Sequence, residues 1–110
     1  MSQDNYIKED RRIFERFKVT LPVNLIDLDA ARESTAETCD VSAKGIGVVG
    51  KDCLKVGNRL ELWLNIDDGN GAFYTKGSVV WSLQQETGKY RSGILLNKAE
   101  LMGMSRIFRS

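Results

Sequence analysis

Alternating apolar and polar residues predict a chain built mainly of short strands. From Phe17 to Leu25 every second residue is apolar, and the same alternation returns over residues 59–66. A period of two residues is typical of a strand with one buried face. Weaker or shorter segments of the same kind, separated by turns rich in Gly, Asp and Asn, cover residues 35–42, 45–50, 72–83 and 90–96.

The last predicted element is a short helix. Asn97 followed three residues later by Glu100 is the pattern of a capping box, and Leu101, Met104 and Phe108 would form the buried stripe. Six short strands followed by one helix favour an all-β fold. We predict a small six-stranded antiparallel barrel, with the helix closing one end or covering a face.

The residues before the first strand have a different character. Residues 1–16 are polar, mixed in sign and without an apolar period. We therefore predict a flexible N-terminal arm over residues 1–16 and a barrel domain with its C-terminal helix over residues 17–110.

Three arginines are concentrated in this arm. The sequence RRIFER, residues 11–16, places Arg11, Arg12 and Arg16 within six positions. Taken alone, Arg12 and Arg16 are also consistent with a solvated helical turn in which Glu15 supplies the counter-charge.

Composition narrows the possible partners. The chain has 110 residues, 42% of them hydrophobic and 28% charged, which is ordinary for one globular domain. A formal net charge of +1 argues against general binding to DNA or RNA, so anion recognition must be local. The polar N-terminus and the absence of a long apolar run predict a cytoplasmic protein with no membrane insertion.

The sequence offers little for catalysis. It has no histidine, no nucleophile elbow and no phosphate-binding loop, so we expect neither an enzyme nor a bound metal or cofactor. Cys39 and Cys53 are expected to be buried thiols in a reducing compartment. Two pairs of carboxylates are typical of solvated turns, namely Asp27 with Asp29 and Asp67 with Asp68.

A second informative segment is DVSAKG, residues 40–45. Asp40 ends one predicted strand, Ser42 follows two residues later, and Gly45 begins the next strand. The Asp and Ser side chains can bind nearby backbone amides and simply shape the loop, and Gly45 can supply a positive φ.

Together, these motifs resemble those of the PilZ domain family. The resemblance rests on Arg12-x-x-x-Arg16 followed by Asp40-x-Ser42-x-x-Gly45. GSVVW at residues 77–81 and YRSGI at residues 90–94 look like the fifth and sixth strands of that family. The resemblance covers about residues 9–108.

The family implies a six-stranded barrel that binds the bacterial second messenger cyclic di-GMP. The paired N–H donors of an arginine guanidinium can bind the O6/N7 edge of guanine or a phosphate. Asp40 would accept hydrogen bonds from the opposite, N1–H and N2–H, edge of guanine. Ser42 would serve the phosphates or hold the loop, and Gly45 would let backbone approach the ligand. Trp81 would stack on a guanine, although a structural position at the barrel rim is equally consistent. Trp63 belongs to no motif and is interpreted as structural.

The resemblance also bears on stoichiometry and output. Arg11, directly before the Arg-x-x-x-Arg motif, resembles family members that bind two intercalated cyclic di-GMP molecules. The chain offers no room for an output domain, so signalling would pass to a protein partner in trans. Two alternatives remain, a PilZ-like adaptor that binds no nucleotide and a small barrel for single-stranded nucleic acid. Low net charge and few aromatic residues count against the latter.

Overall fold

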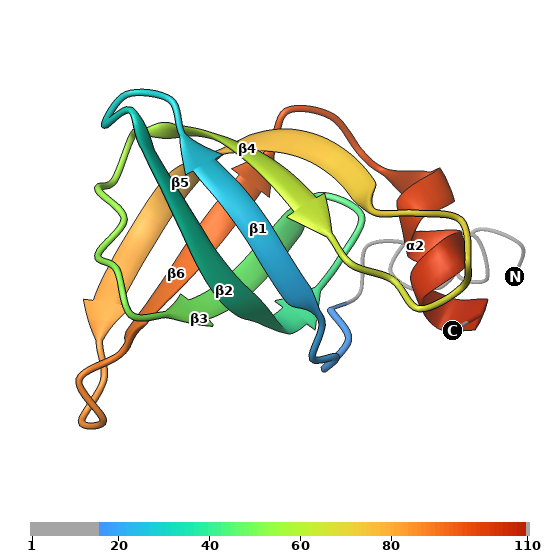
Figure 1. The fold of residues 1–110 in the computed structure, drawn as a ribbon, viewed down its shortest axis with the longest axis horizontal. Coiled ribbons are helices and arrows are strands. Elements are labelled where there is room, and N and C mark those ends of the chain that lie inside the picture. The colour runs from blue at the N-terminus through green and yellow to red at the C-terminus, as the bar shows by residue number, and fades with distance from the viewer. Residues whose placement is uncertain (1–15, 110) are drawn as a thin grey trace, which may run out of the picture.

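The structure, a computed structural model, describes residues 16–109 and forms a closed antiparallel barrel followed by one helix (Figure 1). The strands lie in the order β1-β2-β3-β6-β5-β4, and β1 pairs with β4 to close the barrel. The predicted fold class is therefore confirmed. The elements are β1 (Pro22–Asp27), β2 (Arg32–Val41), β3 (Gly45–Gly50), β4 (Arg59–Leu64), β5 (Phe73–Gln84), β6 (Tyr90–Leu96) and α2 (Leu101–Arg109).

The barrel interior is filled by the apolar positions of the alternating strands. In β4, Leu60, Leu62 and Leu64 are each at most 1% exposed, as the period-two pattern predicts. Because successive strand residues point to opposite faces, the residues between them face outward. The core also includes Val23, Leu25, Val41, Ile46, Val48, Val79, Ile94 and Leu96.

The helix α2 lies at one end of the barrel (Figure 1). Met104 and Ile107 are buried in the core cluster, and a Cβ on Gly103 would lie 2.4 Å from the Phe73 ring. Gly103, which weakens a helix intrinsically, is therefore needed for this close packing. Asp68, in the loop after β4, receives two hydrogen bonds from Arg106 of α2.

Two sequence expectations about α2 need correction. The buried stripe contains Met104 and Ile107, whereas Leu101 is 54% exposed at the start of the helix. The side chain of Phe108 lies outside the described residues. The helix begins at Leu101, so Asn97 precedes its first turn and is not the N-cap. The backbone amide of Asn97 instead donates to the carbonyl of Lys76 on β5.

The first two strands begin at positions that differ from the prediction. β1 begins at Pro22 rather than Phe17, and β2 begins at Arg32, ahead of the predicted residue 35. The apolar residues of 17–21 still pack against the core, which explains their alternation without a continuous ladder. Conversely, residues 32–35 are largely exposed, so their strand structure follows from pairing with β1 and leaves no apolar period.

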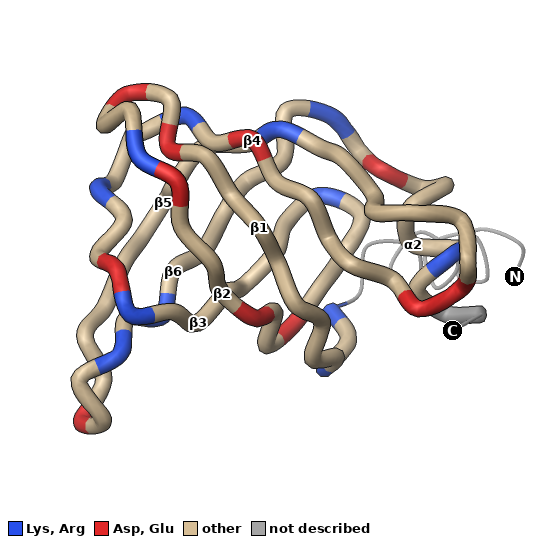
Figure 2. The backbone as a smooth tube through the Cα atoms, in the orientation of Figure 1, with Lys and Arg blue, Asp and Glu red and all other residues tan. Residues whose placement is uncertain are grey.

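The cysteine prediction was wrong in part. Cys39 is partly buried but Cys53 is exposed, and both are free thiols. Cys53 lies in the loop between β3 and β4, where burial is set by loop packing rather than by a strand period. Over residues 16–109, no helix is long and apolar enough to cross a membrane. Charged residues of both signs lie mainly in loops and near strand ends (Figure 2).

Candidate functional site

One pocket on the outer wall of the barrel collects the predicted site residues. An open pocket of about 550 Å³ is lined by Arg16, by residues of the 40–45 segment, and by β5 and β6. Arg11 and Arg12 lie outside the described residues. The other five predicted residues all line this pocket, namely Arg16, Asp40, Ser42, Gly45 and Trp81.

The sheet register explains why residues so distant in sequence meet here. Asp40 on β2 is opposite Gly47 on β3, Gly47 is opposite Gly93 on β6, and Gly93 is opposite Trp81 on β5. These four residues form one row across four neighbouring strands. Neighbouring strands lie about 4.8 Å apart, so the row spans roughly 14 Å. That span is the scale of a dinucleotide rather than of one phosphate.

Two glycines form the floor of this row. A Cβ on Gly47 would lie 2.6 Å from Asp40 Oδ1, and a Cβ on Gly93 would lie 2.1 Å from Trp81 Nε1. The carboxylate therefore leans over one glycine, and the indole leans over the other. Any larger residue at either position would displace the polar or aromatic group that the pocket presents.

Irregularities in two strands adjoin this row. The β2–β3 register shifts between Thr38 and Asp40, and the β5–β6 register shifts between Val79 and Trp81. An extra residue in one strand re-aims the side chains that follow it, and such bulges are common beside functional sites. Here both shifts immediately precede the residues that end the row.

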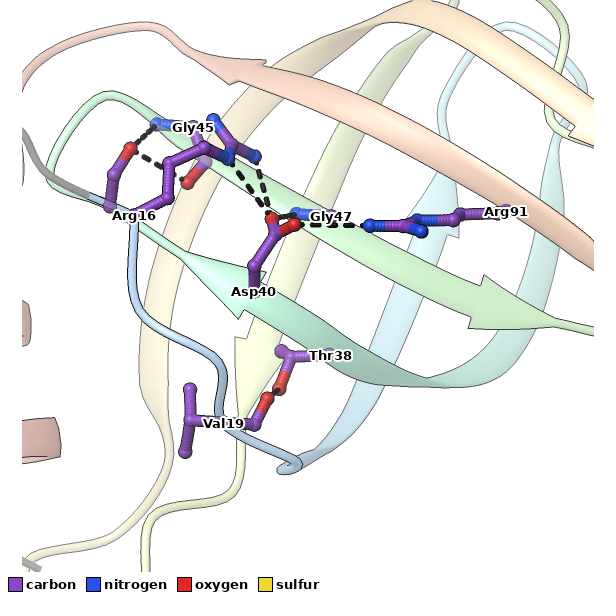
Figure 3. A network of polar contacts seen from close by, with 8 residues as sticks. Arg16, Val19, Thr38, Asp40, Gly45, Gly47 and Arg91 are labelled. Atoms are coloured by element: carbon purple, nitrogen blue, oxygen red, sulfur yellow. Dashed lines mark hydrogen bonds and ion pairs between the residues drawn. The ribbon is translucent and has the colours of Figure 1, made fainter.

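The Asp40 carboxylate is shared by two arginines (Figure 3). Arg16 donates to Oδ1 from Nη2 at 2.7 Å and from Nε at 3.2 Å. Arg91, on β6, donates from Nη2 to Oδ2 at 3.2 Å. The backbone amide of Gly47 also donates to Oδ1, at 3.1 Å. Both oxygens of this single carboxylate are thus engaged, and the two guanidinium groups approach it from different sides.

Arg16 reaches the pocket because residues 17–21 are fixed against β2. Phe17 and Val41 exchange two backbone hydrogen bonds, at 2.9 and 2.8 Å. The buried Thr38 hydroxyl donates to the carbonyl of Val19 and accepts from the amide of Leu21. These contacts satisfy backbone groups that the sheet ladder does not reach, and they bring Arg16 beside Asp40.

Ser42 and Gly45 shape the turn between β2 and β3. The Ser42 hydroxyl accepts from the Gly45 amide at 3.1 Å and donates to the Gly45 carbonyl at 3.2 Å. Ser42 is 4% exposed, so the geometry favours its loop-holding role. Gly45 has no positive φ. Its small size matters instead, because a Cβ there would lie 3.2 Å from both Arg16 Nη1 and the Ile94 carbonyl oxygen.

The two tryptophans occupy different environments. Trp81 is 42% exposed on the outer wall and lies over Gly93. Its indole is accessible from the pocket, as stacking on a base would require. Trp63 lies on β4 and its ring is 5.1 Å from that of Tyr74 on the neighbouring strand β5. This cross-strand aromatic pair agrees with the structural interpretation of Trp63.

Sequence reasoning missed several residues of the site. Arg91 contacts Asp40, Lys44 and Gly93 line the pocket, and Gly47 lies directly against the Asp40 carboxylate. The alternation of β6 could have placed Arg91 and Gly93 on the outer face. Each lies next to a residue whose side chain points inward, Ser92 or Ile94, and successive strand residues point to opposite faces. The register that brings Arg91 toward Asp40 involves a bulge, which the sequence does not show.

Three of the other carboxylates singled out in the sequence, Asp27, Asp29 and Asp68, have structural partners. Asp27 is buried at the end of β1 and accepts hydrogen bonds from the Ala30 amide and the Asn58 side chain. We expected the Asp27 side chain to be solvated in a turn, and this was wrong because the side chain is buried. Asp29 is paired with Arg59, whose hydrogen bonds lower the pKa of the Asp29 carboxyl. Among residues 16–109, no cluster of metal-ligating side chains is present.

The pocket on the barrel wall therefore brings together three kinds of chemical group that can bind a ligand. Guanidinium groups supply planar pairs of donors, the carboxylate supplies a pair of acceptors, and the indole supplies an apolar face. The donors suit phosphates and the O6/N7 edge of guanine. A purine nucleotide with exposed amine and amide donors matches all three features.

Comparisons with known proteins agree on the fold. A sequence model of the PilZ domain matches residues 10–102. Comparison with curated proteins found no match. Similar solved structures include the Bacillus subtilis inhibitor of motility, MotI/DgrA, with a TM-score of 0.68 and 18% identity over 90% of this chain and 48% of that chain. This chain thus spans about half of MotI/DgrA.

Two further structures are similar over nearly their whole lengths. The PilZ domain of YcgR from Escherichia coli, solved with c-di-GMP, has a TM-score of 0.67 and 15% identity, with 90% of both chains covered. The PilZ domain of CeSA from a cellulose-synthesizing bacterium has a TM-score of 0.60 and 18% identity, covering 86% of this chain and 92% of that one. At these identities the likeness concerns the fold.

Proposed function

Because this chain belongs to the PilZ domain family, we propose that it is a receptor for cyclic di-GMP that signals to a protein partner in trans. The observation that carries the proposal is that Arg16 of the first motif lies in one pocket with Asp40, Ser42 and Gly45 of the second. Arg16 and Asp40 are 24 positions apart, yet they form an ion pair of 2.7 Å beside Trp81. In this role the protein is a cytoplasmic binding module rather than an enzyme, and it requires no cofactor.

Each described site residue has a role that follows from its position. Arg16 offers its fork to a guanine O6/N7 edge or a phosphate. Asp40 accepts hydrogen bonds from the N1–H and N2–H groups of a guanine, which adenine lacks. Trp81 stacks on a base from the β5 side of the pocket. Ser42 and Gly45 hold the turn that keeps room for the Arg16 guanidinium and the ligand.

The remaining two arginines extend the proposed site beyond the described residues. Arg12 completes the Arg-x-x-x-Arg motif, and Arg11 precedes it directly. A stacked pair of cyclic di-GMP molecules carries four phosphate charges and four guanine planes. A third guanidinium can neutralise part of that charge and lie against an exposed base. We therefore propose that two ligand molecules bind to each chain.

The output passes to a partner protein. The solved relatives include a protein described as an inhibitor of motility and a PilZ domain of YcgR with bound c-di-GMP. They support a signalling role for this chain. DNA and RNA are not proposed as ligands, because the formal net charge is only +1.

Calorimetric titration tests the proposal directly. Cyclic di-GMP should bind saturably, with micromolar or tighter affinity and two molecules per chain. GMP and a short oligonucleotide serve as controls and should show no comparable binding. Absence of binding to all three would contradict the proposed receptor function and favour an adaptor that works through protein contacts alone. Binding of the oligonucleotide only would favour the nucleic-acid alternative.

A further inference from the structure

Arg91 belongs to neither sequence motif, yet it contacts the motif carboxylate. It lies on β6, opposite Val49 of β3 and Leu83 of β5. Its side chain extends across β3 toward β2 and donates from Nη2 to Asp40 Oδ2 at 3.2 Å (Figure 3). This approach is open because the intervening Gly47 has no side chain. A Cβ on Gly47 would lie 2.6 Å from Asp40 Oδ1.

The two arginines engage different oxygens of Asp40. Arg16 donates twice to Oδ1, whereas Arg91 donates to Oδ2. The guanidinium of Arg16 presents neighbouring N–H groups, which resemble the N1–H and N2–H edge of a guanine. A guanine at Asp40 would therefore compete with Arg16 for the carboxylate. Arg91 contacts the other oxygen and can stay, because a carboxylate oxygen accepts more than one hydrogen bond.

The position of Arg91 costs the folded barrel stability, because one of its donors has no partner. Its Nε is buried and has no hydrogen-bond partner in the structure. A buried donor without a partner is destabilising, and such groups require an explanation. Among residues 16–109, the contact with Asp40 is the only ion pair that Arg91 forms. A residue held in this way is better explained by the site than by the stability of the barrel.

From these contacts we propose that Arg91 is a positioning residue of the nucleotide site, which holds the Asp40 carboxylate toward the pocket while Arg16 turns to the ligand. The inference rests on the proposed binding of cyclic di-GMP. Arg91 acts here through Asp40 and determines how well the site distinguishes guanine from adenine. It does so without needing to touch the ligand.

The first experiment substitutes Arg91→Met, which keeps most of the side-chain stem and removes the guanidinium. We expect at least a five-fold weaker affinity for cyclic di-GMP and a smaller preference over cyclic di-AMP. The melting temperature should stay the same or rise, because the buried Nε is removed as well. Arg91→Lys restores one charged donor and should recover part of the affinity. Unchanged affinity and selectivity in Arg91→Met would overturn the proposal, as would tighter binding.

Arg59→Met is the matched control. Arg59 also forms an exposed ion pair with an aspartate, donating from Nη2 to Asp29 Oδ1 at 2.8 Å, but it lies at the start of β4 outside the pocket. Its substitution should leave affinity and selectivity unchanged. An equal loss in both variants would mean that the effect of Arg91 is one of general surface charge, and this would also overturn the proposal.

A double-mutant cycle separates positioning from direct contact with the ligand. In an Asp40→Ala background, Arg91→Met should weaken binding by less than two-fold, because the carboxylate that Arg91 orients is gone. Fully additive losses would show that Arg91 acts on the ligand directly and would overturn the positioning role. If wild-type protein binds no cyclic di-GMP, the proposed function fails. If the wild-type protein binds cyclic di-GMP and the Arg91 variants bind it just as the wild type does, only the inference about Arg91 fails.

Discussion

Asp40 and Asp68 both bind arginine, but the two carboxylates have different surroundings. Asp68 receives one guanidinium in a bidentate arrangement, from Arg106 Nε and Nη2, both at 2.8 Å. The same Nη2 also donates to the Gly71 carbonyl at 2.6 Å. Asp40 instead divides its oxygens between two guanidinium groups, Arg16 and Arg91, whose side chains are 49% and 42% exposed.

The difference separates a structural contact from a recognition site. The Asp68–Arg106 pair connects the β4–β5 loop to α2, and its side chains are only 17% and 25% exposed. Its donors are engaged within the protein, so little is left for a ligand. Around Asp40, exposed guanidinium groups, a glycine floor and an accessible indole adjoin a pocket. The same ion-pair chemistry therefore serves stability at one end of the barrel and, we propose, binding on its wall.

Substitution of Asp40 should give the largest effect on binding. Asp40→Ala removes both acceptors for the guanine edge, and hydrogen bonds to charged groups contribute about 1.5–3 kcal/mol each. We expect affinity for cyclic di-GMP to fall by at least about 100-fold, the lower end of that estimate for two hydrogen bonds, with loss of the preference over cyclic di-AMP. Asp40→Asn should recover little, because an amide cannot accept from both donors. Competitive titration with the two cyclic dinucleotides measures both quantities.

The comparison would break if Asp40 proved to be structural. A variant that still rejected cyclic di-AMP as strongly as wild type would show that Asp40 only shapes the turn. A large fall in melting temperature with unchanged affinity would place Asp40 in the same class as Asp68.

Arg16→Ala should have the next largest effect. Loss of one charge-assisted contact costs about 1.5–3 kcal/mol, so affinity should fall at least ten-fold. The melting temperature should change little, since the Arg16 side chain is half exposed and exposed ion pairs contribute little to stability. Calorimetry and thermal unfolding of the same samples separate the two outcomes. Equal affinity with a lowered melting temperature would assign Arg16 to the barrel rather than to the ligand.

Arg11→Leu tests the stoichiometry rather than the strength of the first binding event. We expect wild type to saturate at two cyclic di-GMP molecules per chain and the variant at one, with the Arg12–Arg16 site still occupied. Leucine can neither neutralise phosphate nor offer a guanidinium plane to a base. The number of sites comes from titration at protein concentrations well above the dissociation constant. Saturation of wild type at one ligand per chain would contradict the prediction, whatever the affinity.

The sequence predicted the barrel where one strand face is buried and the other is solvated. Leu60, Leu62 and Leu64 show this clearly, because their alternation coincides with a strand whose inner face is fully buried. The start of β2 was missed because residues 32–35 are polar and mostly exposed. Their strand structure depends on hydrogen bonds to β1, which no local pattern records.

The candidate site was predictable only where a motif concentrates its residues. Asp40, Ser42 and Gly45 lie within six positions, and the structure places all three in one pocket. Arg91 and Gly93 carry no motif, and their relevance arises from the register between β3 and β6. Gly93 is opposite Gly47, which is opposite Asp40, whereas Arg91 is opposite Val49 and reaches Asp40 through its long side chain. Contacts of this kind depend on tertiary pairing and on a bulge in β2, neither of which the sequence shows.

Substitution at Asp68 should change stability and leave binding unaffected. Asp68→Asn removes the charge that holds Arg106, so the melting temperature should fall by a few °C, with affinity for cyclic di-GMP within two-fold of wild type.

Hydrogen bonds from the Arg106 side chain, and then from the Asn70 amide, lower the pKa of the Asp68 carboxyl well below its usual value of 3.8. A carboxyl with a lowered pKa in the folded state stabilises the protein above its unfolded pKa, and this contribution is lost as the pH falls. The difference in melting temperature between wild type and Asp68→Asn should therefore persist at pH 5 and 7 and shrink below about pH 4. Thermal unfolding at these pH values, with titration at pH 7, tests both parts. A loss of affinity comparable to that of Asp40→Ala would show that the two carboxylates do not have separate roles.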